Sequence, residues 1–444
     1  MPALSSYLQL FSDYVKGLQL NMNDQEVTLR CYAELMIRFG VNLQPGQSLR
    51  IGAELEHAPL VRLAAEVAYE AGAAYVQVDW SDTPLQRARF MHSAAEHLAY
   101  FPAYEVTRHE QMVEEGWARL ALVGQSHPEL MKDVDPAKMR TVAVTRAQRL
   151  KFYTQAMMAN KMQWCVAGVP TRAWAAQVYP ELTPDEALAR LWATVLHTCR
   201  LDAPDPLAAW RAHDTALKSV AKYLMEHEVR TLHFVDEETG PDGKPLTDLT
   251  IGLTERPNWV TASAQRPDGV PFMPNMPTEE VFTTPDNRRA DGYARLSKPA
   301  FPFQREVRDA IVHFAGGEVV DFDAAEGRAV LEQFFALDGT RRLGEVALVE
   351  TDSPVGQAGV VFFDILFDEN AACHIAFGEA YPEGVVGGSA MSADELRELG
   401  VNKADAHLDV MIGTPTLRLT GVTLSGGEVP VMEKGKFVPA VTGG

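Results

Sequence analysis

Two patterns of apolar spacing alternate between about residue 25 and residue 235. Short apolar runs have the length of buried strands, and between them lie segments whose apolar residues recur at helical spacing, such as 59–70. The strand-like runs lie at 48–52, 75–80, 119–123, 141–144 and 164–169. This order predicts an α/β domain built on an open, mostly parallel sheet.

One helix start in this region carries a full set of signals. Thr183 is a capping residue, Pro184 suits the first turn, and Glu186 is placed to close a capping box. No G-x-G-x-x-G motif follows any strand-like run, so the phosphate-binding loop common in such sheets is not expected. We therefore interpret this region as a scaffold.

The character of the sequence changes near residue 260. All seven tryptophans lie at or before Trp259, and five prolines fall between Pro267 and Pro285. Beyond this point the pattern predicts a hairpin with Gly316 and Gly317 at its turn. It also predicts a helix near 325–335 and alternating strands at 345–349, 407–412 and 416–422. We expect an α/β scaffold domain over 1–260 and a strand-rich α+β domain over 261–444.

Composition narrows the classes of protein that fit. Of 444 residues 46% are hydrophobic and 23% are charged, which is typical of a soluble globular protein. The formal charge of −20 repels phosphate backbones and anionic membrane surfaces, so no nucleic-acid or membrane partner is expected. The four cysteines are scattered, and no apolar stretch approaches the roughly 20 residues that cross a bilayer. A cytoplasmic protein with reduced thiols is the expectation.

Candidate chemistry begins with His407 and Asp409 in the segment AHLDVMIG. Because the two residues are two apart and alternate with apolar residues, a strand would place imidazole and carboxylate on the same face. That arrangement suits metal binding. An ordinary solvent-exposed strand face would give the same pattern.

Two further positions lie in the segment FFDILFDENAACHIAFGEAY. His374 has small and apolar neighbours, and Tyr381 follows seven residues later. A histidine and a tyrosine packed in the core would explain this spacing as well.

Acidic residues complete the set. Glu345 opens an apolar run in RRLGEVALVE, and Glu279 and Glu280 are adjacent in NMPTEEVFTTPD. Adjacent residues of an extended segment point to opposite faces, so at most one of the pair enters a shared site. A solvated acidic loop is the alternative. Together, carboxylate, imidazole and phenol donors without thiolate favour two hard or borderline divalent cations.

At these residues the chain resembles the thermophilic-type metallo-aminopeptidases, the aminopeptidase T, aminopeptidase S and PepS group. The likeness rests on NMPTEEVFTTPDNRRADGY, RRLGEVALV, GVVFFDILFDENAACHIAFGEAY and HLDVMIG, in that order. It implies a catalytic C-terminal domain that binds two divalent ions through one of the two adjacent glutamates and five other residues. We favour Glu280, so the implied ligands are Glu280, Glu345, His374, Tyr381, His407 and Asp409.

The resemblance also implies a function and a mechanism. Two ions (zinc, cobalt, manganese or magnesium) would activate a water molecule and polarise the scissile carbonyl of peptides with a free N-terminus. Glu345, or the member of the glutamate pair that binds no metal, would move the proton to the leaving amine. Tyr381 would bind a metal or stabilise the oxyanion. A homodimer is implied as well.

Two other functions use the same donors. One is another two-metal hydrolase, an amidase or a phosphoesterase, although no basic phosphate clamp lies near these motifs. The other is a non-catalytic, metal-dependent binding protein. A catalytic site needs an open metal position, which a site used only for binding tends to lack.

Overall fold

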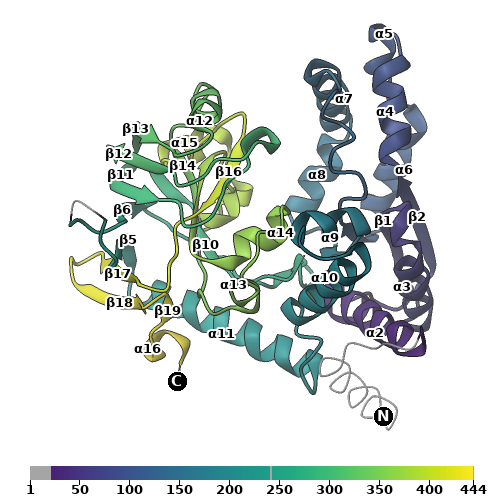
Figure 1. Cartoon of the computed structure of the whole chain (residues 1–444). Helices are drawn as coiled ribbons and strands as arrows, with labels where there is room; N and C mark the ends of the chain where they lie inside the picture. Colours follow the sequence, from purple (N-terminus) through teal and green to yellow (C-terminus); the bar gives the residue numbers. More distant parts are fainter. Residues whose placement is uncertain (1–21, 241–242, 444) are drawn as a thin grey trace. The chain divides into compact units, whose positions relative to one another are not determined.

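The structure, a computed structural model, describes residues 22–240 and 243–443 (Figure 1). These residues form two compact units, 22–210 with 263–276, and 211–262 with 277–443. Compactness alone does not define an independently folding domain, so the domain boundary expected near residue 260 stays a prediction. The fold is mixed, with one parallel sheet and antiparallel, strand-rich sheets, as the sequence indicated.

The first unit is built on a sheet of five strands in the order β2-β1-β3-β4-β9. Every pairing in this sheet is parallel, which confirms the expected parallel sheet. Its strands are β1 (Ser48–Glu54), β2 (Tyr75–Ser81), β3 (Ala118–Val123), β4 (Trp164–Gly168) and β9 (Asn275–Met276). A separate short pair joins β7 (Ala264–Gln265) to β8 (Pro271–Phe272).

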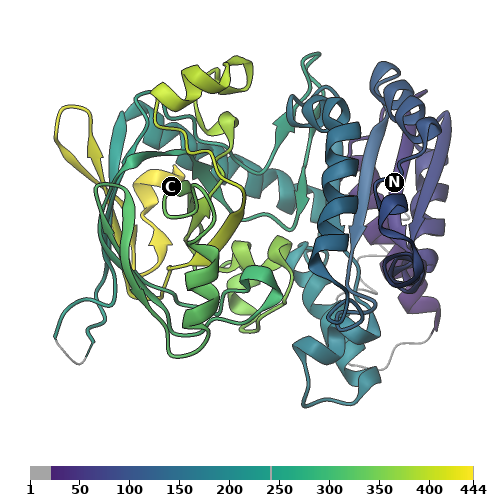
Figure 2. The same ribbon diagram turned by 90° about the horizontal axis from the view of Figure 1, so that it is seen from above.

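Helices flank this sheet on both sides (Figure 2). The helix that links β1 to β2, α3, packs against both of these strands. The helices of this unit are α2 (Met22–Leu35), α3 (Ala58–Glu70), α4 (Thr83–His92), α5 (Ala95–Leu98), α6 (Ala103–Glu114), α7 (Pro136–Arg149), α8 (Lys151–Met158), α9 (Arg172–Val178) and α10 (Pro184–Thr198), with short helical turns at Met36–Gly40 and Leu55–His57. The capping box expected at α10 is present, because Thr183 and Glu186 bond to each other's backbone. That prediction is confirmed.

The prediction of a strand at residues 141–144 is wrong. Residues 141–144 lie inside α7, where the side chain of Asp135 accepts a hydrogen bond from the backbone of Ala137 and Pro136 occupies the first turn. The hydroxyl of Thr141 bonds to the carbonyl of Ala137 four residues earlier. None of the residues of α7 is fully buried, and of the run only Val142 packs against a small cluster that includes Phe90. The helix-start signals therefore prevail over the short β-branched run.

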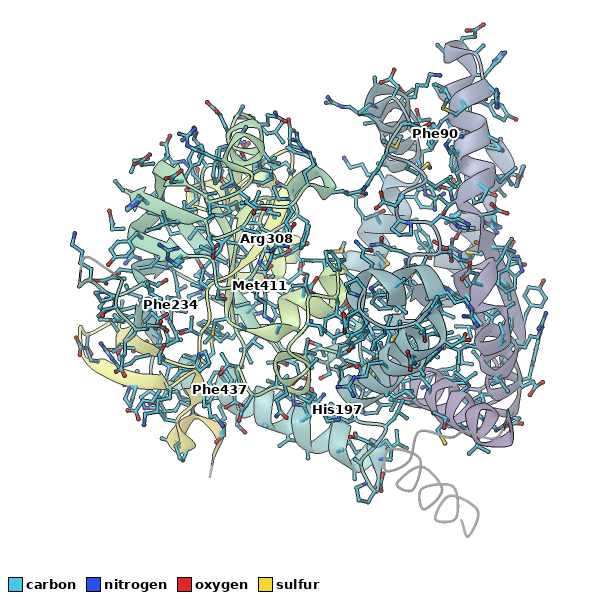
Figure 3. The ribbon with its side chains drawn as sticks, viewed as in Figure 1. Phe90, His197, Phe234, Arg308, Met411 and Phe437 are labelled. Atoms are coloured by element: carbon cyan, nitrogen blue, oxygen red, sulfur yellow. The ribbon has the colours of Figure 1, made fainter. Side chains whose placement is uncertain are left out.

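The second unit contains an eight-stranded antiparallel sheet, whose strands curve strongly (Figure 2). Its core includes Phe234 of β5, which is labelled in Figure 3 and is fully buried. In spatial order the strands are β13 (Glu318–Asp323), β12 (Ile311–Ala315), β11 (Pro285–Arg295), β6 (Asp248–Leu253), β5 (Val229–Asp236), β17 (Leu417–Thr423), β18 (Glu428–Glu433) and β19 (Lys436–Phe437).

A second, four-stranded antiparallel sheet carries the candidate chemistry. Its order is β10 (Val281–Thr283), β14 (Leu343–Leu348), β15 (His374–Gly378) and β16 (His407–Met411). The helices of this unit are α11 (Pro206–Glu226), α12 (Arg328–Phe334), α13 (Pro354–Gln357), α14 (Ile365–Asp368), α15 (Ala393–Glu398) and α16 (Pro439–Thr442), with short helical turns at Pro302–Gln304, Glu369–Ala371, Pro382–Gly384 and Gly388–Ala390. No helix among the described residues is both long and apolar enough to span a bilayer.

The expected hairpin is present, formed by β12 and β13 with Gly316 and Gly317 between them. Both glycines have positive φ, 58° and 81°, as the commonest two-residue hairpin turns require. The two positions differ in their surroundings. A Cβ on Gly317 would lie 2.2 Å from the carbonyl oxygen of Asn287, whereas a Cβ on Gly316 would have no neighbour within 4 Å.

This difference gives a matched pair of substitutions. Gly317→Ala is expected to lower the free energy of unfolding by about 2 kcal/mol or more, because it adds a backbone collision to the strain of a positive φ. Gly316→Ala carries only the strain and is expected to cost about 1 kcal/mol. Denaturant unfolding of both variants measures the difference. Equal losses would contradict the close approach to Asn287.

Candidate metal-binding site

The four-stranded sheet presents one polar face and one apolar face. On β15, Ile375 and Phe377 point to the apolar face, where the ring of Phe377 packs 5.1 Å from Phe335 and 6.0 Å from Phe314. His374 and Ala376 point to the other face because side chains of a strand alternate. Aromatic packing therefore fixes which side of the strand His374 occupies.

The strand register aligns the acidic residues on that face. Glu345 of β14 pairs with Ala376 of β15, and Ala376 pairs with Asp409 of β16. Residues paired across antiparallel strands point to the same side, so the two carboxylates flank the small side chain of Ala376. His374, paired with Met411 (labelled in Figure 3), and His407 lie two residues away on either side of this row.

A β-bulge places the side chain of Glu345 on this face of the sheet. Leu343 pairs with Phe377 on the apolar side, and Glu345 pairs with Ala376, so Gly344 is an extra residue in β14. Without that residue, Leu343 and Glu345 would share a face. Gly344 suits the bulge because a Cβ there would lie 2.4 Å from the carbonyl oxygen of Glu379.

His374 is fully buried among carboxylates. Its Nδ1 donates to the carbonyl of Ala372 at 3.3 Å. Its Nε2 lies 3.4 Å from Glu280 Oε2 and 3.5 Å from Glu345 Oε1, and it has no hydrogen-bond partner. With Nδ1 protonated, the lone pair of neutral Nε2 faces two acceptors. Only a cation or a second proton makes this contact favourable.

His407 has the same arrangement. Its Nδ1 donates to the carbonyl of Glu379 at 2.7 Å. Its Nε2 lies 2.9 Å from Asp409 Oδ1 and 4.0 Å from Glu345 Oε2. Histidines that bind metals commonly donate the other ring nitrogen to a carbonyl or carboxylate, which fixes the ring. Both histidines of the site meet that condition.

The donors form two groups that share one residue. Glu280, Glu345 and His374 form the first, and Glu345, His407 and Asp409 form the second, with one donor atom from each residue within 4.8 Å of the others. Nitrogen and oxygen donors at this density suit divalent cations. Together with the orphaned Nε2 of His374, this donor set fits a metal site.

Burial and neighbouring charges shift the pKa values of the donor residues. Burial, followed by the neighbouring charge of Glu345, raises the pKa of Glu280 to about 8. Burial opposes the charged form of both histidines, yet the carboxylates outweigh it and raise the pKa of His374 and of His407 to about 9. Burial also opposes ionisation of Asp409, but His407 and His374 keep its pKa below the usual value. At neutral pH, cations would therefore compete with protons for these donors.

The structure separates the two adjacent glutamates. Glu280 lies beside His374 and belongs to the first donor group. The carboxylate of Glu279 lies 3.4 Å from His213 Nε2, and its backbone NH donates to Asn370 Oδ1 at 2.6 Å. Glu279 belongs to neither donor group among the described residues.

Tyr381 lies next to His407 of the second donor group. Its ring centroid is 5.0 Å from that of His407. Burial, with the charges of Glu345 and Asp409, raises the pKa of its phenol well above the usual value, so the hydroxyl stays protonated and can donate a hydrogen bond.

One residue of the site was missed by the sequence reasoning. Glu369 sits in the turn before β15, is half-buried, and has its pKa raised by burial and by the charges of Glu280, Asp409 and Glu345. The helical turn that carries it contacts β16. Glu369 has no periodic spacing to the other donors, and only its position inside a quoted motif could have drawn attention to it.

Comparison with known proteins places the chain in a family. Residues 25–437 match the family described as thermophilic metalloprotease (M29). The chain is 40% identical to aminopeptidase 2 of Geobacillus stearothermophilus over 94% of this chain and 99% of the relative. It is 38% identical to aminopeptidase PepS of Streptococcus thermophilus, over 92% of this chain and 98% of the relative.

A solved structure agrees with these sequence matches. Wild-type AmpT from Thermus thermophilus superposes with a TM-score of 0.84 at 36% identity, covering 93% of this chain and 99% of that chain. The match extends over both compact units. The chain therefore belongs to the thermophilic metalloprotease (M29) family, which confirms the resemblance found in its motifs and the expectation of a metallopeptidase, a hydrolase of peptide bonds.

Proposed function

We propose that this protein is a metal-dependent aminopeptidase that removes the N-terminal residue of peptides at a two-metal site. The observation that carries the proposal is the pair of donor groups joined by Glu345. A shared carboxylate is suited to bridge two cations a few ångströms apart. The names of the relatives, aminopeptidases over nearly the whole chain, support the same activity.

In this proposal each group holds one ion. Glu280 and His374 would hold one ion and His407 and Asp409 the other, with Glu345 belonging to both groups. Divalent ions bound there supply a polarised carbonyl and an activated water at neutral pH. Zinc, cobalt, manganese and magnesium all accept these donors, so supply decides which is used.

The remaining residues act on the substrate and on protons. The protonated hydroxyl of Tyr381 is placed beside His407 to donate to the developing oxyanion. Glu345, which belongs to both donor groups, would also move the proton to the leaving amine. Glu369 lies among the carboxylates of these groups, where burial and their charges raise its pKa, and could accept a hydrogen bond from the α-amine of the substrate, which would restrict cleavage to the first residue.

The proposal includes the cellular setting expected from the sequence. The substrates are peptides with a free N-terminus, the chain works as a homodimer in the cytoplasm, and neither nucleic acid nor a membrane takes part. The acidic charge of −20 supports the last point.

Hydrolysis of aminoacyl-p-nitroanilides tests the proposed activity. Protein stripped with a chelator is assayed on free and N-blocked substrates, with and without added zinc, cobalt or manganese. Cleavage of only the free substrates, restored by metal, is the expected result. Equal cleavage of blocked substrates would indicate another hydrolase, and no cleavage with any metal would indicate a binding protein.

Tyr381→Phe tests the oxyanion role. Loss of the hydroxyl is expected to lower kcat by about 10- to 100-fold with little change in KM, because the hydrogen bond strengthens only in the transition state. Steady-state kinetics on a free aminoacyl-p-nitroanilide measures this. A rise in KM at unchanged kcat would instead place Tyr381 in ground-state binding.

A further inference from the structure

The parallel sheet of the first unit carries positive charge on one of its faces. Arg50 of β1 and Arg119 of β3 are direct partners in the strand register, so two guanidinium side chains start from adjacent points of the same face. Like charges placed directly opposite each other destabilise a sheet. The alternate residues Leu49 and Leu120 are fully buried on the other face, which forces both arginines to this side.

Only part of this charge is neutralised by the protein. Arg50 Nε donates to Asp79 Oδ2 at 2.6 Å, and Arg108 Nη1 donates to Asp79 Oδ1 at 2.6 Å. Arg108 Nη2 also donates to Glu105 Oε2 at 2.8 Å. Arg108 Nε is buried and has no acceptor. Two carboxylates therefore serve two of the arginines, and one buried N–H remains unsatisfied.

Two more arginines lie in the same cluster and form no ion pair with any described residue. Arg119 Nη1 points to the sulfur of Met157 at 3.7 Å, a weak acceptor. Burial and the charges of Arg50 and Arg146 lower the pKa of Arg119. Arg146 is exposed on α7, and partial desolvation with the charges of Arg50 and Arg108 lowers its pKa against the attraction of Glu105. Four guanidinium groups thus face two carboxylates, in a protein whose overall charge is strongly negative.

The same face has open space beside these charges. Gly52, two residues after Arg50 on β1, has no atom within 4 Å of the position that a Cβ would occupy. Its strand partners are Asp79 on β2 and the small Ala121 on β3. Gly52 is also partly accessible to solvent although it lies inside the central part of the sheet. A small ligand can therefore reach the floor formed by Gly52 and Ala121.

We propose that this arginine hollow, formed by Arg50, Arg108, Arg119 and Arg146 above Gly52 and Ala121, binds a small dianion such as a phosphate group. Two excess positive charges match a dianion, and the planar guanidinium fork pairs with phosphate and carboxylate oxygens alike. The acidic body of the protein repels long polyanions, so the ligand is a small molecule. Neither the proposed peptidase activity nor its metal site involves this hollow.

Calorimetric titration of the metal-loaded protein with inorganic phosphate, and separately with succinate, tests the site. The wild-type protein is expected to bind at least one of them saturably, and the tighter probe shows whether the hollow takes phosphate or paired carboxylates. Arg119→Gln is expected to weaken that binding at least about tenfold, because it removes a charge-assisted donor. Arg172→Gln changes an exposed arginine paired with Asp185 and serves as the matched control.

A second variant tests the hollow without touching any charge. Gly52→Val fills the open space with a side chain that strands favour, so the protein is expected to stay folded. The valine side chain would occupy the space next to Gly52 that the dianion needs. Binding is expected to fall at least about tenfold, and phosphate is expected to raise the melting temperature of the wild-type protein but not of this variant. Absence of binding by both probes would overturn the proposal. Undiminished binding in Gly52→Val and Arg119→Gln would overturn it too, because the anion would then lie elsewhere, for example on the bound metals.

Discussion

Replacing Glu345 by glutamine is expected to lower kcat/KM on a free aminoacyl-p-nitroanilide by at least about a thousandfold. Among the described residues, Glu345 alone belongs to both donor groups, so its loss weakens both metal positions at once. Glutamine keeps the volume of the side chain but removes the negative charge. Metal content per chain, measured by atomic emission, is expected to fall in parallel with activity.

A neighbouring glutamate provides the control. Glu350 follows β14, is half-buried, and accepts a hydrogen bond from the backbone NH of Phe437 at 2.9 Å. It lies outside both donor groups, and glutamine can still accept that hydrogen bond. Glu350→Gln is therefore expected to keep nearly wild-type activity and metal content. Activity of Glu345→Gln within about tenfold of wild type would contradict a shared metal ligand.

Residues that lie close together on one strand could be assigned to a common face from the sequence. His407 and Asp409 are two apart between apolar residues, and the structure places both on the polar face of β16, with His407 Nε2 2.9 Å from Asp409 Oδ1. The alternation of side chains along a strand depends only on neighbouring residues, so it can be predicted from the sequence alone. The same holds for the hairpin at Gly316 and Gly317, whose turn requires only those two glycines.

The apolar spacing along the chain does not predict which residues enter the site where that depends on strand pairing between distant segments. Alternation indicates that only one of Glu279 and Glu280 enters the site. Which one does depends on the register of Val281 with Leu348, more than 60 residues away. The sheet face to which Glu345 points depends on a β-bulge at Gly344, and the spacing of apolar residues in the sequence does not reveal that bulge. A resemblance to known motifs supplied what strand geometry alone left open.

The fold shows the same division between local and distant information. Four of the five strands of the parallel sheet can be predicted because each is a short apolar run followed by a helix, whereas the two-residue strand β9 gives no such signal. The eight-stranded sheet was not recognised as one sheet, because β5 pairs with β17 from the far end of the chain. Residues 141–144 were assigned to a strand because four β-branched or small residues outweighed the weaker signal of an exposed helix.

Glu280→Gln is expected to have opposite effects on the metal-free and the metal-loaded protein. In the metal-free protein the pKa of Glu280 is about 8 in the folded state, against an ordinary value of 4.5. Near pH 8, folding must therefore keep a proton on Glu280 or bury its charge, at a cost of about 4 kcal/mol. Glutamine removes this cost, so the chelator-treated variant should melt at a higher temperature than chelator-treated wild type. With metal bound, the variant lacks a charged ligand and should melt at a lower temperature.

The pH dependence separates this effect from a general gain in packing. A folded-state pKa raised above the unfolded value gives stability that is complete below pH 4.5 and is lost as the pH rises to about 8. The raised pKa values of His374 and His407 extend the loss to about pH 9. Metal-free wild type should therefore lose stability between pH 5 and 9, and Glu280→Gln should lose less of it below pH 8.

Glu279→Gln, which changes the adjacent buried glutamate beside His213, should show no reversal of sign between the two states. A Glu280→Gln variant that is less stable than wild type in both states would mean that Glu280 stabilises the fold through its own contacts and is not held for a cation.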